Sequence, residues 1–579
     1  MDESEVISLA LLGIVALGVI VAAGVFSRKL GVAAPLILIV VGVGLSYVPG
    51  APVVIPNEVI LIGLLPPILY ASAITVPVID LRRNLGTISA LSVALVVVSA
   101  VLTGLLLFAL FPDLELAAAI AIGAVISPTD AVAATAVAKK LGLPSRLITI
   151  LEGESLVNDA TALVLLRSAV AATAATASFW EVLGDFAFAV AVAVLVGLAI
   201  GFLAVRLRAR LADPVLDTAV SFIVPFAAFL PAEFLGASGV LAVVVAGLYS
   251  GHNAATAFTA QSRITERTNW RTLQFVLENG VFLLMGIQVS YLVRQTEEFD
   301  LSAHVAVLIG LLVVLVVLGI RFAFVGPLIL LLRRRDSLNV QRMSLVEQGM
   351  AAFRARVSDE RWAGDERVRR HSERVEQRVR RRRADVDQLK TEGLDWRGGV
   401  VLGWAGMRGV VTLAAAQSLP EETPYRPQLI LIAFTVAVVT LLAQGGTLPW
   451  VIRLTGIRGS DAAADRRSLA ALFDELAEAG VVVLDEPRDA AIEDAVVQRV
   501  RADTLSSARA ARERAAAEGD APSPEASYRA LRREVLEAQR AALLEARSAG
   551  TYPSRILARA QSMLDLEETR LEQLEGGGS

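Results

Sequence analysis

The sequence contains no cysteine and only three histidines among 579 residues, at His252, His304 and His371. The absence of cysteine excludes disulfides, thiolate catalysis and cysteine-based metal sites. The first residues, MDESEV, are acidic, so the chain lacks the basic segment that opens a secretory signal peptide. Residues 457–579 show no glycine pattern of a nucleotide-binding loop. The remaining candidates for functional residues are charged side chains within apolar sequence.

Apolar residues are abundant, at 55% of the chain, and the mean hydropathy is +0.60. Soluble domains are about 45–50% apolar, so a large membrane part is predicted. The net charge of −4 is small, but the charge is segregated: the first half is apolar, and charged residues gather in two later blocks. We expect no nucleic-acid partner.

Runs of about 18 or more apolar residues predict membrane-spanning helices. The sequence therefore predicts an all-α polytopic membrane protein with about thirteen spans. The predicted spans are 5–26, 31–49, 57–76, 85–111, 115–138, 146–168, 181–206, 214–233, 237–251, 271–293, 303–332, 400–419 and 427–453.

The loops between these runs alternate in charge, and cytoplasmic loops are expected to carry the Lys and Arg. The basic set is Arg28-Lys29, Arg82-Arg83, Lys139-Lys140, Arg206 with Arg208 and Arg210, Arg263 with Arg267 and Arg271, the block after Leu332, and Arg453 with Arg458. The loops between them are acidic or neutral. This order predicts an external N-terminus and a cytoplasmic C-terminus.

Two segments are predicted to lie outside the membrane. Residues 1–455 form the transmembrane domain, which includes a basic cytoplasmic insertion at 333–398. This insertion is expected to be a solvated helix pair, or alternatively to dock on anionic lipid headgroups. Residues 456–579 have an amphipathic pattern, as in YRALRREVLEAQRAALLEAR, and predict a small helical domain. It packs on itself, on a partner subunit or beneath the membrane domain.

The stretch from Ser127 to Arg167 carries Asp130, Glu154 and Asp159 within two very apolar segments. Carboxyl groups at membrane depth are energetically expensive and usually mark an ion or proton pathway. A hydrogen-bonded packing role is the alternative for a single buried aspartate, but it accounts poorly for three acids together. We interpret this stretch as the ion-exchanging centre of a transporter.

Asp159 is the best-placed of these acids. With Ser155 and Asn158 it falls on one helical face, at positions i, i+3 and i+4. It lies about 13 residues, or roughly 20 Å, from the cytoplasmic start of its span, which is near the bilayer midplane. A carboxyl that holds either a proton or a cation is sufficient to couple two flows in opposite directions.

Two spans are predicted to be interrupted. Pro128, with Thr129 and Asp130, falls midway along 115–138, where proline removes a backbone donor and a freed carbonyl such as that of Thr129 could ligate a cation. The sequence GWAGMRGVVT places glycines and Arg408 midway along 400–419. Interruptions in two corresponding spans predict inverted repeats with the site at their crossing.

Arg321 and Arg408 are the buried cations that could balance these acids. We assign Arg321 to Glu154 as a structural ion pair, which leaves Asp159 free to titrate.

Serine hydrolysis by Ser155 is disfavoured because no histidine is predicted at a compatible depth. His252 is expected at a cytoplasmic helix end and His304 near the outer face, so a metal site shared between them would have to cross the membrane. We therefore expect no enzymatic activity and no cofactor.

Several motifs carry a family resemblance: SPTDAVA, KKLGLPSRLITILEGESLVNDATALVL, LLPPILYASAITVP with NLGT, and GMRG. They resemble the bacterial form of the sodium/proton exchanger (monovalent cation:proton antiporter) family over about residues 5–455. The resemblance implies thirteen helices in a dimerisation part and an ion-carrying core, broken fifth and twelfth helices that cross beside the sixth, a homodimer and elevator-like alternating access.

The same resemblance implies roles for individual residues. Asp159 of the Asn-Asp pair binds the cation and the proton, Ser155 and the backbone at Thr129 are supporting ligands, and Asp130 and Arg408 belong to the crossing. Relatives with Asn-Asp here are generally electroneutral. This chain departs from many relatives at Ala71-Ser72, where an acidic residue is common, and in the long insertion at 333–398.

The sequence thus predicts an electroneutral Na⁺ (or K⁺, Li⁺)/H⁺ antiporter of the bacterial plasma membrane that acts in pH homeostasis. Two alternatives stay open at this point. One is a cation channel with the same polar interior, and the other is a membrane-anchored signalling protein whose working part is the C-terminal domain.

Overall fold

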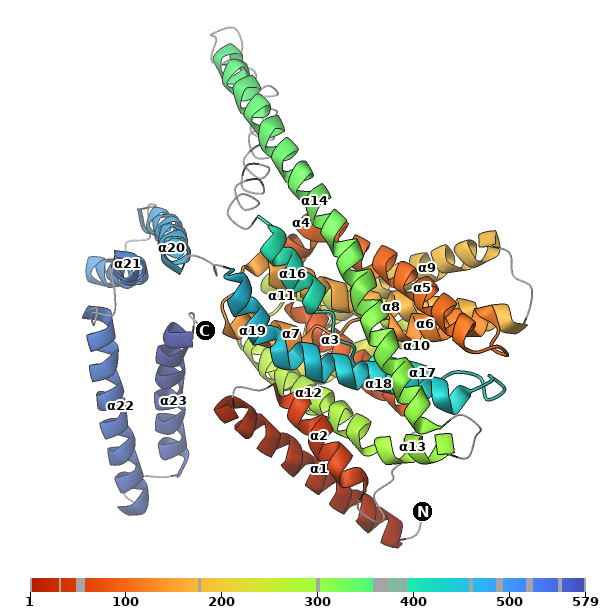
Figure 1. Ribbon diagram of the computed structural model, residues 1–579. Coiled ribbons are helices and arrows are strands. Elements are labelled where there is room, and N and C mark those ends of the chain that lie inside the picture. The colour runs from red at the N-terminus through yellow and green to blue at the C-terminus, as the bar shows by residue number, and fades with distance from the viewer. Residues whose placement is uncertain are drawn as a thin grey trace. The chain divides into compact units, whose positions relative to one another are not determined.

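The computed structural model describes residues 3–30, 33–47, 58–174, 179–297, 302–357, 393–457, 462–485, 493–516, 524–549 and 554–576, with four single residues between 375 and 386. Within these residues the secondary structure is helical, without a strand (Figure 1). The chain divides into two compact units, Met1–Ile457 and Arg458–Ser579.

The helices of the first unit follow the predicted apolar runs. They are α1 (Glu3–Leu30), α2 (Ala34–Ser46), η1 with α3 (Val59–Leu64, Leu65–Thr75), α4, η2 and α5 (Val78–Ser89, Ala90–Ala94, Leu95–Leu110), α6 (Leu116–Ile126), α7 (Val132–Lys140), α8 (Ser145–Ala174), α9 (Phe179–Arg208), α10 (Pro214–Phe234), α11 (Gly239–Ala257), α12 (Ala260–Ile287), α13 (Val289–Glu297), α14 (Ala303–Val357), α16 (Trp396–Trp404), α17 (Val410–Gln417) and α18, η3 and α19 (Arg426–Thr440, Leu441–Gly445, Gly446–Thr455). Within the described residues, eight helical segments are long and apolar enough to cross a membrane.

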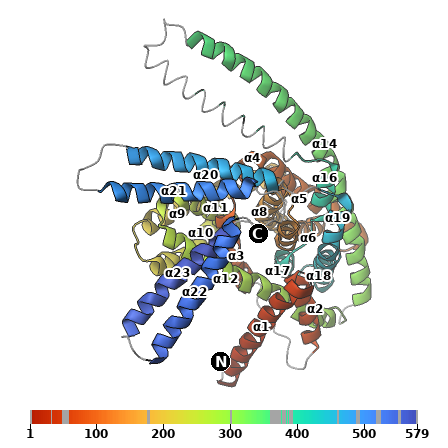
Figure 2. The same cartoon turned by 90° about the vertical axis from the view of Figure 1, so that its left-hand side faces the viewer.

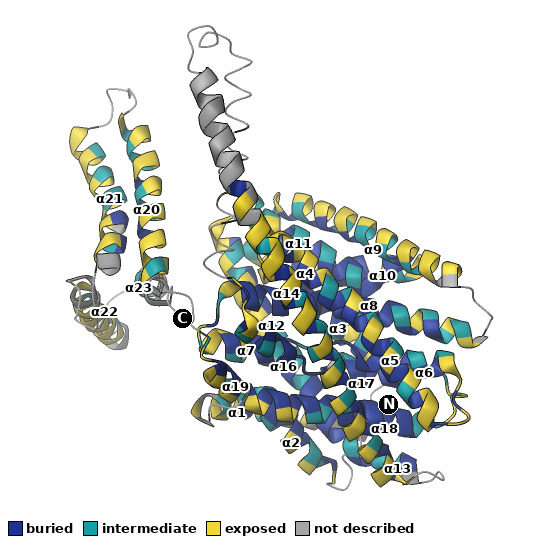
Figure 3. Ribbon diagram, turned by 45° about the horizontal axis from the view of Figure 1, so that its top comes forward, coloured by how far each residue is buried: buried dark blue, intermediate teal, exposed yellow. Residues whose placement is uncertain are grey.

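Large apolar side chains cover the outside of this unit. Leu195 and Leu203 on α9 and Leu315 on α14 are each more than 60% exposed. Figure 3 shows the same contrast between α9, which is largely exposed, and α18, which is largely buried. Such a surface is unfavourable in water but matches the hydrocarbon interior of a bilayer, where helices satisfy their own backbone groups. The unit is a multi-pass membrane protein.

Both predicted helix interruptions are present. α6 ends at Ile126 and α7 begins at Val132, so the first gap contains Pro128. α16 ends at Trp404 and α17 begins at Val410, so the second gap contains Gly409. A Cβ atom on Gly409 would lie 2.6 Å from Oδ2 of Asp130, and this close approach explains why glycine is needed there.

The end of α14 differs from the prediction, because the helix does not stop near residue 332 but continues to Val357 (Figure 1). The apolar sequence ends near residue 332. The helix continues because Pro327 is its last proline and the residues that follow favour helix. The start of the basic insertion is therefore a continuation of a span. The guanidinium of Arg146 on α8 contacts Asp336 at 3.3 Å. Most of the remaining insertion, where the second helix and lipid docking were expected, lies outside the described residues.

The second unit contains α20 (Ala462–Asp485), α21 (Asp494–Ala516), α22 (Pro524–Ala549) and α23 (Ser554–Gly576). α20 lies beside α21, and α22 lies beside α23, as two helix pairs (Figure 2). Arg512 contacts Asp474 at 2.7 Å across the first pair, and Arg540 contacts Asp565 at 2.9 Å across the second. These ion pairs are exposed to solvent, so each contributes little to stability.

Candidate functional site

The predicted site residues gather where the two interrupted helices meet α8. Thr129 and Asp130 lie in the gap between α6 and α7, while α8 carries Glu154, Asn158 and Asp159. The backbone N–H of Asp130 donates to the carbonyl oxygen of Met407 at 2.7 Å. This bond joins the α6–α7 gap to the α16–α17 gap directly.

Asn158 connects α8 to the first gap. Its side-chain nitrogen donates to the carbonyl oxygen and to Oγ1 of Thr129, both at 2.9 Å. Asn158 is completely buried, and its Oδ1 atom has no hydrogen-bond partner within the described part of the chain. Because a buried oxygen without a partner is unfavourable, it is a candidate ligand for a cation.

Ser155 and Asp130 cap the start of α7. Oγ of Ser155 accepts a hydrogen bond from the N–H of Ala131 at 3.3 Å, and Oδ1 of Asp130 accepts one from the N–H of Val132 at 2.8 Å. A carboxylate at a helix N-terminus stabilises the exposed N–H groups and the positive end of the helix dipole. Asp130 thus helps to hold the break.

Glu154 and Arg321 form a buried ion pair with two contacts. Nη1 and Nη2 of Arg321 lie 2.6 and 3.0 Å from Oε1 and Oε2 of Glu154. Thr129 donates from Oγ1 to Oε1 of Glu154 at 2.8 Å, and Nε of Arg321 donates to the carbonyl of Leu402 at 3.0 Å. The pair connects α8, α14, α16 and the α6–α7 gap, and the charge of Glu154 is compensated.

Among the residues that the structure describes, Arg408 donates to backbone carbonyls and to no carboxylate. Its Nε donates to the carbonyl of Ile126 at 3.0 Å, and its Nη1 donates to the carbonyl of Gly406. These carbonyls lie at or just beyond the C-terminal ends of α6 and α16, where helix dipoles concentrate negative charge. Asp130 and Arg408 therefore stabilise opposite kinds of helix end at one crossing.

Asp159 differs from its neighbours. Its side chain is partly exposed, and within the described residues it forms no hydrogen bond or ion pair. The charge that acts on it is the negative charge of Asp130. A carboxylate in this setting is well suited to accept a proton or a monovalent cation as its substrate.

Sequence reasoning missed some buried charges. Arg208, which was assigned to a basic loop, is buried and contacts Asp217 at 2.7 Å and Glu266 at 2.8 Å. The argument from loop charges missed these contacts because it counts charged residues without considering their neighbours. Glu278 was also missed, although it stands in the apolar run LQFVLENGVFLLMG and the argument applied to Asp159 would have found it.

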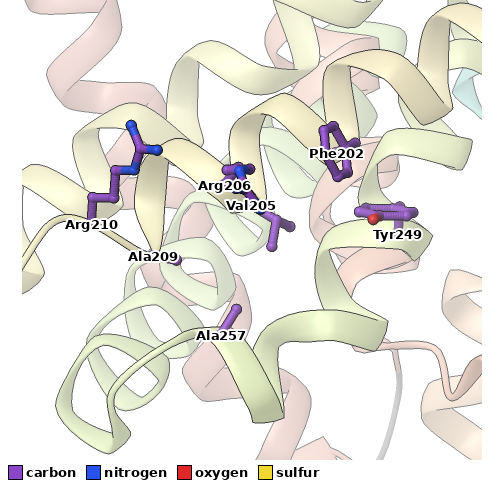
Figure 4. Close-up of a pocket in the computed structure, with 7 residues that line it drawn as sticks. All are labelled: Phe202, Val205, Arg206, Ala209, Arg210, Tyr249 and Ala257. Carbon is purple, nitrogen blue, oxygen red and sulfur yellow. The ribbon is translucent and has the colours of Figure 1, made fainter.

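A separate surface hollow lies between α9 and α11 (Figure 4). In the close-up, Phe202 and Tyr249 face each other, beside Val205 and Ala257. The residues lining it are Phe202, Val205, Arg206, Ala209, Arg210, Tyr249 and Ala257. None of them is acidic, so this hollow is not where the carboxylates meet.

The family assignment rests on residues 14–454, which match the family described as "Sodium/hydrogen exchanger, transmembrane". The chain belongs to the sodium/hydrogen exchanger family. An uncharacterised Na⁺/H⁺ exchanger of Mycobacterium bovis is 30% identical over 96% of each chain. The Na⁺/H⁺ antiporter ApNhaP of Aphanothece halophytica is 27% identical over 76% of this chain and 72% of its own.

The exchanger fold is shared with a solved structure. The sodium proton antiporter MjNhaP1 from Methanocaldococcus jannaschii superposes with a TM-score of 0.53, covering 78% of this chain and 98% of its own at 16% identity. At this identity the likeness establishes the fold. Exchangers of this family are transporters, not enzymes, and this chain is a cation:proton antiporter.

Proposed function

We propose that this exchanger moves one proton for one Na⁺, or for K⁺ or Li⁺, with Asp159 binding each in turn. The observation that carries this proposal is the setting of Asp159. It is a carboxylate beside the helix crossing that no described side chain or backbone N–H group engages. Ser155, the backbone of Thr129 and Asp130 are the supporting cation ligands.

In the proposed cycle, Asp159 binds a proton while it faces outside. The core then moves, and the proton is released inside in exchange for a cytoplasmic cation. One group that holds either species couples the two flows. In this proposal Glu154 stays balanced by Arg321 at 2.6 Å, Asp159 is the carboxylate that exchanges the proton for the cation, and the exchange is electroneutral.

An elevator-type movement is the proposed route of alternating access. The bond from Asp130 to Met407 and the contact of Arg408 with Ile126 tie the two interrupted helices together. Asn158 and Glu154 tie α8 to the same crossing. Elements linked in this way are suited to move as one body, as expected for transporters with interrupted helices.

The cellular setting is also part of the proposal. We place the protein in the bacterial plasma membrane as a homodimer that contributes to pH homeostasis, with the N-terminus outside and the C-terminus in the cytoplasm. The alternating basic loops support this orientation. Residues 1–455 are the transport domain, 456–579 are a cytoplasmic domain, and the insertion at 333–398 is a candidate for contact with anionic lipids.

The decisive experiment compares the wild type with Asp159→Asn in proteoliposomes. We expect saturable, pH-dependent exchange that Asp159→Asn abolishes while the fold is retained. Near-normal exchange by the variant would refute the role of Asp159, and single-channel currents would favour a channel. Rates with Na⁺, K⁺ and Li⁺ would establish the cation preference, and an effect of clamping the membrane potential would refute electroneutrality.

A further inference from the structure

Glu278 is an acidic residue in the second half of α12, within the largely apolar run LQFVLENGVFLLMG. The proposed exchange cycle does not use it. Its side chain is partly exposed, as are those of Asp130 and Asp159. An ionisable group at this position in a membrane helix is energetically unfavourable, and such groups usually mark an ion or proton pathway.

The helix face that carries Glu278 is directed at two other elements. Gln274, Glu278 and Val281 share this face, because they are four and three residues apart. Gln274 donates from Nε2 to Oγ of Ser72 on α3 at 3.1 Å and to Oε1 of Glu278 at 2.7 Å. Val281 packs with Ile60 of η1 and Ala414 of α17. Glu278 therefore lies between contacts with α3 and contacts with an interrupted helix.

No cation pairs with Glu278 in the described part of the chain, and its hydrogen bond comes from a neutral amide. The formal charge that acts on it is that of Asp130. The same aspartate acts on Asp159. The negative charge of Asp130 thus acts on two carboxylates that come from different helices.

α3 provides no acid at this position. Ala71 is buried, and Ser72 is the polar side chain that reaches α12 through Gln274. We propose that Glu278 is a second cation-attracting carboxylate of the exchange site, supplied by α12, which receives the cation on its way to Asp159. This inference rests on the proposed role of Asp159.

The balance of charge supports a cation-attracting role. Glu154 and Arg321 compensate each other. Asp130, Asp159 and Glu278 carry three negative charges when all are ionised and Arg408 carries one positive charge, which leaves a surplus of two negative charges among these four described residues. Packing does not require the charge of Glu278, since a glutamine would accept the same hydrogen bond from Gln274.

The test is the cation dependence of exchange in Glu278→Gln. We expect the apparent KM for Na⁺ to rise about tenfold while the rate at saturating Na⁺ stays within about twofold of wild type. Asp185→Asn, which removes an exposed charge on α9, is the control and should leave KM unchanged. In the double variant Ser72→Glu with Glu278→Gln, moving the carboxylate to α3 should restore KM.

A second measurement does not depend on transport. The rise in unfolding temperature of detergent-solubilised protein with added Na⁺ should need higher Na⁺ in Glu278→Gln. If Glu278→Gln fails to fold, the KM for Na⁺ is measured in Glu278→Asp and in the double variant instead. Both variants should keep a KM near that of the wild type. An unchanged KM in Glu278→Gln, with Asp159→Asn inactive, refutes this inference alone. Exchange by Asp159→Asn refutes the proposed function instead.

Discussion

The backbone N–H of Asp130 donates to the carbonyl of Met407 at 2.7 Å, so the two interrupted helices are hydrogen-bonded to each other at their breaks. This bond uses main-chain atoms, and its geometry depends on how closely the backbones approach. Gly409 permits this approach because it has no Cβ atom. The stability of the crossing should therefore be sensitive to small changes in volume.

Gly409→Ala should destabilise the fold. The new Cβ atom would lie 2.5 Å from Cβ of Asp130, and relieving this overlap should cost about 1–3 kcal/mol. We expect a lower unfolding temperature in detergent and slower exchange. Gly319→Ala on α14 is the control, because its Cβ would meet no atom within 4 Å, and it should be neutral or slightly stabilising. Equal effects of the two substitutions would contradict this account.

Glu154→Gln should be strongly destabilising. It leaves the buried guanidinium of Arg321 without its carboxylate, a loss of about 3–5 kcal/mol. Exchanging the two residues, with Glu154→Arg and Arg321→Glu, should recover more folded protein than either single change. Recovery should be partial, because Thr129 and the carbonyl of Leu402 would then face the wrong charge. Size-exclusion chromatography and thermal unfolding measure the amount of folded protein. If the exchanged variant recovers no folded protein, the result contradicts the assignment of the two residues as an ion pair.

Arg408→Lys should impair the crossing even though it keeps the charge. One guanidinium contacts the carbonyls of Ile126 and Gly406, and a single ammonium group cannot reproduce that geometry. We expect a loss of about 1–3 kcal/mol and reduced exchange. Arg397→Lys is the control, since Arg397 donates to the carbonyl of Gly456 at an exposed position. A functional Arg408→Lys protein would show that charge alone is sufficient.

Removal of residues 458–579 should leave exchange intact. The first unit ends at Ile457 and has its own hydrophobic core. Proteoliposomes containing the shortened chain should show saturable, pH-dependent exchange, with any change confined to its pH set point. Complete loss of transport by a folded, truncated protein would instead make the second unit part of the working machinery.

Much of this architecture could be predicted because the membrane makes a charge in an apolar run informative. Asp159 and Arg321 are visible in this way, and Pro128 is visible as a proline midway along an apolar run. Local patterns carry less information on contacts between distant segments. The sequence offered Arg321 and Arg408 for the buried acids, and only the structure shows that Arg408 contacts carbonyls.

The helix boundaries illustrate a second limit of prediction from hydropathy. Hydropathy falls after Leu332, but a helix ends where its backbone is interrupted, and α14 has no such interruption before Val357. Hydropathy also does not reveal which charged residues outside the apolar runs are buried. Arg208 follows an apolar stretch like any loop arginine, and its two carboxylate partners come from α10 and α12.

The hydrogen bonds around Thr129 have a defined direction. The hydroxyl hydrogen of Thr129 goes to Glu154, so its oxygen only accepts from Asn158. Both bonds that the Asn158 amide nitrogen makes go to oxygens of Thr129, so the amide cannot be flipped without loss. A carboxylate at position 158 has no N–H group to donate. Its oxygens would face the two oxygens of Thr129 and repel them unless the carboxyl group stayed protonated. Adding a second carboxylate beside Asp159 would therefore require changes to the hydrogen bonds of Thr129 as well as a substitution at residue 158.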